Sequence, residues 1–217
     1  ASDRAAGPTT EFRLGPLVRF AAADHVSALL WVATTELLVL VVLQLAGPEA
    51  SAFYFMSFTI AYSLYLVTSQ VGSPLVAEAA KYPEREVALI RSAFGHAARL
   101  VVPLALIACL LAPWLLRLIG RSYAESGTTL LRLLLLSAIP QIVVGISLSV
   151  ARIRRDNRLI LLVYLALAIG VFGGTVLTIR GWGLTGVGLS WLVTQTVIAL
   201  ALLITGKTRA MGGSGVH

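Results

Sequence analysis

One apolar run decides in which solvent this chain folds. Residues 128–150 are mostly apolar, follow a polar turn at 120–127, and precede four arginines, Arg152, Arg154, Arg155 and Arg158. A helix of about 20 apolar residues crosses the hydrocarbon core of a bilayer, and clustered arginines mark its cytoplasmic end. The run therefore predicts a transmembrane helix that ends in the cytoplasm.

The composition extends this interpretation to the whole chain. Of 217 residues, 58% are hydrophobic and 12% are charged, whereas soluble domains are about half apolar and about a quarter charged. The net charge of +7 comes from basic residues between apolar runs. Membrane topology and anionic lipid headgroups account for such a distribution. We expect a polytopic membrane protein whose partner is the lipid bilayer, with no nucleic acid.

Signals of catalysis are missing from the sequence. Cys109 is the single cysteine, so it forms no internal disulfide and no multi-cysteine metal site. The chain has no HExxH motif, no P-loop and no paired carboxylates within a span, and 145–149 lacks the final glycine of a serine nucleophile motif. The sequence predicts no enzyme activity, no cofactor and no metal.

Alternating apolar and polar segments predict an all-α, polytopic transmembrane bundle with six spans. Most of the 17 Lys and Arg residues fall in segments that this layout places inside, while Arg117, Arg121 and Arg180 fall outside. Both ends are then cytoplasmic. The predicted parts are a linker and interfacial segment at 1–24, a bundle at 25–206 with spans at 26–46, 52–76, 100–119, 128–150, 159–178 and 184–205, an amphipathic helix at 83–99, and a tail at 207–217.

Two stretches carry a family resemblance. The first has Gly120, Tyr123, Ala124, Leu130, Leu131, Pro140 and Gln141 followed by a basic loop, and the second is the glycine-rich segment 181–190. Both resemble the second half of polysaccharide and oligosaccharide flippases of the multidrug/oligosaccharidyl-lipid/polysaccharide exporter superfamily. The resemblance implies one six-helix half of a MATE-like transporter in the bacterial inner membrane. Its implied partners are a lipid-linked saccharide and a missing N-terminal half, which agrees with a chain that lacks an initiator Met.

Four polar residues within spans are candidates for a substrate or ion cavity: Glu36, Arg132, Gln70 and Gln141. A carboxylate such as Glu36 costs several kcal/mol at mid-membrane unless it meets water or polar partners, here Thr34, Gln44 or Gln70. Arg132 either snorkels to the headgroups or faces the cavity, where a guanidinium fork suits a diphosphate. Gln70, Gln141 and Gln195 also suit hydrogen bonds between helices.

Two further groups have positions that suggest roles. Arg152, Arg154, Arg155 and Arg158 set topology and bind lipid, or they hold a lipid diphosphate at an inner gate. Gly72, Pro74 and Pro140 are candidate hinges for alternating access, or they mark static kinks. Gly170 with Gly174, and Gly186 with Ser190, are small-xxx-small pairs that let helix backbones approach closely.

Three functions are compatible with these features. The leading hypothesis is a transporter that moves a lipid-linked oligosaccharide across the bacterial inner membrane by alternating access. The second is a drug/cation antiporter of the same superfamily, which we expect to carry more acidic residues in its cavity. The third is a non-transporting membrane scaffold that recruits cell-envelope enzymes through the basic face.

Overall fold

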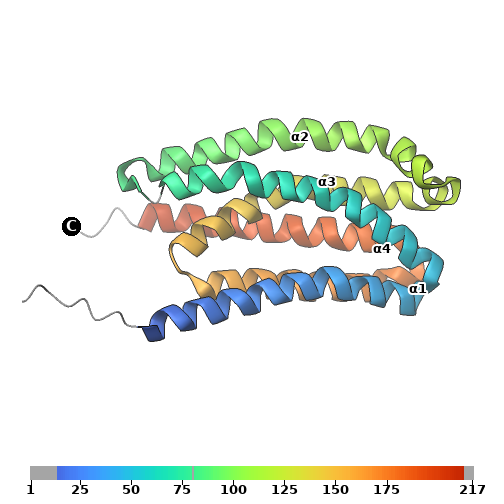
Figure 1. The fold of residues 1–217 in the computed structure, drawn as a ribbon, viewed down its shortest axis with the longest axis horizontal. Coiled ribbons are helices and arrows are strands. Elements are labelled where there is room, and N and C mark those ends of the chain that lie inside the picture. Colours follow the sequence, from blue (N-terminus) through green and yellow to red (C-terminus); the bar gives the residue numbers. More distant parts are fainter. Residues whose placement is uncertain (1–13, 80, 213–217) are drawn as a thin grey trace, which may run out of the picture.

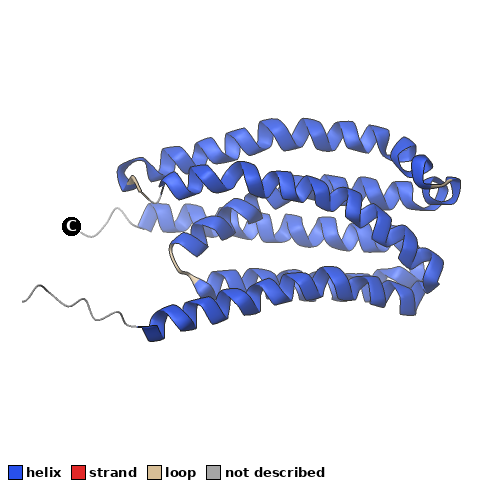
Figure 2. Cartoon of the chain, in the orientation of Figure 1, coloured by secondary structure: helices blue, strands red, loops and turns tan. Residues whose placement is uncertain are grey.

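The computed structural model describes residues 14–79 and 81–212, and this part of the chain is helical apart from short turns (Figures 1 and 2). The four α-helices are α1 (Leu14–Ala79), α2 (Glu86–Ile119), α3 (Arg121–Ile153) and α4 (Asn157–Gly212), with a 3-10 turn, η1, at Pro83–Arg85. All four are long and apolar enough to cross a membrane. The predicted all-α class is confirmed.

Two of the helices fold back on themselves. Gly47 within α1 has φ 88° and Gly183 within α4 has φ 53°, both outside helical geometry. Glycine adopts positive φ without the steric penalty that a Cβ brings. In α1 the Ser51 hydroxyl donates to the Val39 carbonyl at 3.0 Å, although twelve residues separate them. Each helix is therefore a hairpin, with arms at 14–46 and 48–79 in α1 and at 157–182 and 184–212 in α4.

The turns gather at two opposite ends of the bundle (Figure 1). One end, here called the glycine end, holds the turns at Gly47, Gly120 and Gly183. The other, the basic end, holds residues 81–85 and 154–156 together with the start of α1 and the end of α4. The Asp156 carboxylate accepts a hydrogen bond from the Leu159 amide at 3.2 Å, and so caps α4.

Close backbone approach holds the two arms of α4 together. A Cβ added at Gly170 would lie 2.5 Å from Thr194 Cγ2, and one at Gly174 would lie 2.7 Å from Ser190 Oγ. A Cβ at Gly186 would lie 2.6 Å from Thr178 Oγ1 and 3.0 Å from a backbone carbon. The predicted small-xxx-small contacts are confirmed, and they join the two arms of one hairpin.

The prolines do not end the helices that contain them. The predicted amphipathic segment 83–99 and span 100–119 form one continuous helix from Glu86, with Pro103 and Pro113 inside it. Pro74 lies within α1 and Pro140 within α3, and α1 departs from helical geometry at Gly47. The hinge role of Gly72, Pro74 and Pro140 stays a prediction.

Helix α3 is the central element. It packs against each of the other three α-helices and has the largest buried share of the four. Its inner side carries Leu130, Leu131, Leu134 and Leu135, all at most 1% exposed. Large apolar side chains cover the outside of the bundle instead, such as Leu110 (74% exposed) and Leu177 (83%). Such a surface suits hydrocarbon rather than water.

Candidate functional site

The exposed side of α3 near the glycine end is polar. Its exposed residues recur at helical spacing, and we call them the polar strip: Ser122, Glu125, Ser126, Thr129 and Arg132. From Leu133 to Ala151 the helix has no exposed residue. The outer face of α2 differs, because its exposed residues Leu106, Leu110, Leu111 and Trp114 are apolar. The polar strip therefore contrasts with the apolar outer face of the neighbouring helix α2.

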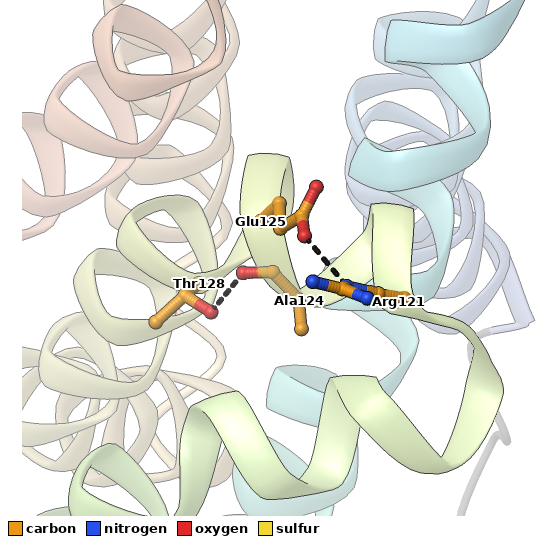
Figure 3. Close-up of polar contacts among 4 residues, drawn as sticks. All are labelled: Arg121, Ala124, Glu125 and Thr128. Carbon is orange, nitrogen blue, oxygen red and sulfur yellow. Dashed lines mark hydrogen bonds and ion pairs between the residues drawn. The ribbon is translucent and has the colours of Figure 1, made fainter.

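The outermost turn of the strip is held by local contacts (Figure 3). The Arg121 guanidinium donates to the Glu125 carboxylate at 3.1 Å, and the Thr128 hydroxyl donates to the Ala124 carbonyl at 2.5 Å. Arg121 and Glu125 are well exposed, and their opposite charges offset each other. Arg117, the other arginine near this turn, lies 6.0 Å from the centroid of the Trp114 ring.

Arg132 ends the polar strip and contacts α2. Its Nε donates to the Cys109 carbonyl at 3.1 Å, and the Cys109 thiol lies 3.5 Å from the Arg132 carbonyl. In a regular helix the Cys109 carbonyl would accept from the amide of residue 113, but that residue is Pro113, which has no N–H. Arg132 therefore supplies the donor that the proline removes. This pairing of Arg132 with Pro113 was not predicted.

Arg132 also lies deep along the helix. It follows Gly120 by twelve residues, which at the helical rise is about 18 Å along α3. Relative to the centre of the predicted span 128–150 it is displaced by seven residues, or about 10 Å, which is within a hydrocarbon core about 30 Å thick. Among the described residues its guanidinium makes the hydrogen bond to Cys109 and no ion pair. The other guanidinium nitrogens remain available to a ligand.

Glu36 lies on the exposed side of the first arm of α1. Its exposed neighbours on the helix are apolar, among them Val32, Leu37 and Leu40. Within the described residues its carboxylate has no hydrogen-bond or ion-pair partner, and the Thr34 hydroxyl instead donates to the Leu30 carbonyl at 2.7 Å. No contact joins Glu36 to Arg132, so a cavity shared by both residues stays a prediction.

The two glutamines of the predicted cavity differ in burial. Gln70 is exposed on the second arm of α1, whereas Gln141 is half-buried on α3 with its Oε1 buried and unpaired among the described residues. Among the residues that the structure describes, neither makes a hydrogen bond that would link helices. Their cavity role stays a prediction.

The arginines at the basic end make contacts within the protein. The Arg152 guanidinium donates to the Tyr164 hydroxyl at 3.1 Å, and Arg154 forms an ion pair with Glu86 at the start of α2. Arg155 has φ 54° in the turn before α4, and Arg158 is exposed. These contacts join α2, α3 and α4 at one end, while binding of lipid or a diphosphate by the four arginines stays a prediction.

An aromatic cluster in the middle of the bundle was missed by the sequence analysis. Trp191 packs edge-on against Trp31 at 6.1 Å between ring centroids and lies 5.4 Å from Phe58. Its indole N–H donates to the Tyr54 hydroxyl at 3.3 Å. Both arms of α1 and of α4 contribute to the cluster, whose members are Trp31, Tyr54, Phe58, Tyr62, Tyr164 and Trp191. The rings are far apart in sequence, so no local pattern predicts them.

The comparisons with known proteins identify no family. No family model, curated protein or solved structure is significantly similar to this chain. Within the described part of the chain, no cluster of three or more His, Cys, Asp or Glu residues is placed to hold a metal ion. The features that bear on function are therefore the polar strip, which includes Arg132, and the arrangement of charges between the two ends.

Proposed function

We propose that the chain is a six-crossing transporter bundle that translocates a lipid-linked oligosaccharide or polysaccharide precursor across a membrane by alternating access. The observation that carries the proposal is the polar strip, whose Arg132 lies exposed at hydrocarbon depth. An exposed guanidinium inside a bilayer is costly and faces water or a polar partner. A transport pathway supplies both.

The two hairpins support six crossings. A straight helix as long as α1, with 66 residues, would span about 99 Å, far more than one bilayer. The positive φ at Gly47 and Gly183 divides α1 and α4 into two arms each, and every arm is long enough for one crossing. With α2 and α3 this makes six, and all the turns at one end lie on one side of the membrane.

The basic end is proposed as the cytoplasmic side. It holds Lys81, Arg85, Arg152, Arg154, Arg155 and Arg158. The glycine end holds Arg117, Arg121 and Arg180, of which Arg121 is paired with Glu125. This asymmetry supports an orientation with the basic end inside, and the resemblance noted in the sequence supports the bacterial inner membrane as its location.

Arg132 is suited to an anionic substrate group. Its Nε is held by the Cys109 carbonyl, which orients the guanidinium and leaves its terminal nitrogens for a ligand. A fixed guanidinium matches the oxygens of a phosphate or diphosphate. The saccharide and the second half of the transporter as partners come from the sequence resemblance alone.

The two alternatives each have one supporting observation. A drug/cation antiporter is favoured by Glu36, an exposed carboxylate at the centre of the predicted span 26–46 with no partner among the described residues. A scaffold is favoured by the basic end, where Arg158 is exposed beside the arginines bonded to Tyr164 and Glu86. Neither alternative explains the polar strip.

The test is complementation of a strain that lacks the gene for the full-length protein. We expect lipid-linked oligosaccharide to accumulate on the cytoplasmic leaflet and the wild-type gene to relieve this. Arg132→Ala should lower export about tenfold or more, because a hydrogen bond to a charged group contributes about 1.5–3 kcal/mol. Thr129→Leu should also impair export, since it places an apolar side chain between Ser126 and Arg132 in the strip.

Leu110→Ala is the matched control, because Leu110 is exposed on the neighbouring helix next to Cys109. It should restore export at the wild-type level, with protein amounts in the membrane checked for every variant. Full export by Arg132→Ala would contradict the proposal. The Glu36→Gln variant alone could instead lose efflux of cationic drugs without accumulating saccharide. That result would favour the antiporter over the saccharide transporter.

A further inference from the structure

Gln195 is a buried amide without a partner. Its side chain is 0% exposed, and neither Oε1 nor Nε2 has a hydrogen-bond partner among the described residues. An amide has two N–H donors and an acceptor oxygen, and burying such a group unpaired costs several kcal/mol. Buried polar groups of this kind are ordinarily satisfied by protein groups or by ordered water.

From the packing of α3 on α4 we infer that Gln195 lies opposite Ser137. A Cβ at Gly188 would lie 2.9 Å from Leu133 Cβ and 3.3 Å from Leu130 Cδ1, so Gly188 faces this part of α3. The second arm of α4 and α3 both run from the glycine end to the basic end (Figure 1). Seven residues return to the same helical face. Gln195 lies seven residues after Gly188 on α4, and Ser137 lies seven residues after Leu130 on α3. Gln195 and Ser137 therefore lie at the same level along the bundle and face each other.

Other polar groups belong to the same level. The Ser137 hydroxyl is hydrogen-bonded to the Tyr65 hydroxyl of α1 and to the Leu134 carbonyl, and all three residues are at most 4% exposed. One turn beyond Ser137, Gln141 has a buried and unpaired Oε1. Pro140 has no N–H, so the Leu136 carbonyl loses its usual helical donor. These groups come from three helices and none is charged.

We propose that this layer is an internal water site, in which ordered water bridges the Gln195 amide to the Tyr65–Ser137 pair and to Gln141. Water both donates and accepts, which matches an amide whose N–H₂ and C=O both lack partners. A metal cation would satisfy only the oxygens and leave Nε2 unpaired. The charged and metal-ligating side chains that a tightly held ion prefers are absent from the residues named in this layer.

Water-edited NMR tests the site directly. The full-length protein would be labelled with ¹⁵N-glutamine and reconstituted in lipid nanodiscs, and the Gln195 amide signal identified by its loss in Gln195→Met. We expect magnetisation to pass from water to this amide as readily as to the exposed Gln70 amide. No transfer to the Gln195 signal would overturn the proposal. If the signal instead shifted on adding Na⁺ and received no magnetisation from water, the site would bind a cation and not water, and the proposal would be overturned.

Thermal unfolding gives an independent readout. If water satisfies the amide, Gln195→Met removes the hydrogen bonds between the amide and this water. We expect the melting temperature to fall by about 3–9 °C, since each lost hydrogen-bonding group lowers stability measurably. Combining it with Ser137→Ala should lower the melting temperature by less than the sum of the two single changes, because the bridging water is lost only once, while the Tyr65–Ser137 hydrogen bond is lost in addition. Gln70→Met is the control for loss of an exposed amide and should leave the melting temperature unchanged. A rise in melting temperature for Gln195→Met would show a dry, unpaired amide and overturn the proposal.

Discussion

Gly186→Ala is expected to destabilise the α4 hairpin strongly, although alanine is the better helix former. Its new Cβ would lie 2.6 Å from Thr178 Oγ1, 2.7 Å from Thr178 Cβ and 3.0 Å from the carbonyl carbon of that residue. Neither a Cβ nor a backbone atom can rotate away, so the two arms must separate. Overpacking of this kind costs about 1–3 kcal/mol, which corresponds to a melting temperature lower by about 2–12 °C. Thermal unfolding of the full-length protein in nanodiscs measures this change in melting temperature.

Gly173→Ala is the matched control on the same helix. A Cβ at Gly173 would meet nothing within 4 Å. There the helix propensity of alanine should act alone and raise stability by about 0.5–1 kcal/mol. Thr178→Gly in the Gly186→Ala background should recover part of the loss, because it removes two of the three clashing atoms. Equal melting temperatures for Gly186→Ala and Gly173→Ala would contradict the close approach of the two arms.

The second large effect that we expect concerns Arg132, whose contribution to stability should depend on the presence of Pro113. Arg132→Met removes the donor to the Cys109 carbonyl and leaves this carbonyl unpaired in the bilayer. We expect a loss of about 1–3 kcal/mol in stability. Pro113→Ala supplies a backbone N–H to the same carbonyl. In the Pro113→Ala background, Arg132→Met should therefore have little effect on stability.

A double-mutant cycle on unfolding free energies measures this coupling, which we expect at about 1–2 kcal/mol. Pro103→Ala is the control, because the carbonyl that Pro103 leaves free belongs to Arg99, four residues earlier in α2. Arg132→Met and Pro103→Ala should be additive. Additivity of Arg132→Met with Pro113→Ala would show that the Cys109 contact contributes nothing to stability.

Local sequence patterns predicted the elements better than the contacts between them. The stop at Gly47–Pro48, the start of a helix at Leu184 and the small residues of the α4 hairpin depend on neighbouring residues, and the structure bears them out. The polar strip could also have been found, since its residues recur every three or four positions in α3. The boundary between the predicted polar turn at 120–127 and the predicted span at 128–150 divides these residues, so their common spacing was not recognised.

Contacts between distant helices depend on how α1, α2, α3 and α4 align, and a single sequence does not contain this information. Arg132 meets Cys109 only because α2 and α3 turn back at Gly120 with one particular register. The aromatic cluster needs rings from both arms of two hairpins. Of the candidate partners of Glu36, Thr34 donates instead to the Leu30 carbonyl of its own helix.

The central claim is that four long helices make six crossings with the basic end inside. It is tested by cysteine labelling of the full-length protein in the Cys109→Ala background, with single cysteines replacing exposed residues. Glu49, Ser122 and Trp182 sample the glycine end, whereas Lys81 and Arg158 sample the basic end. Leu110→Cys, at hydrocarbon depth on α2, should not react with a membrane-impermeant thiol reagent from either side.

We predict that cysteines at positions 49, 122 and 182 react with the reagent applied outside intact spheroplasts. Those at positions 81 and 158 should react only after the membrane is opened. If α1 and α4 instead crossed the membrane once each, positions 49 and 182 would be embedded and protected from both sides. Such protection, or labelling of position 81 from outside, would contradict the six-crossing bundle.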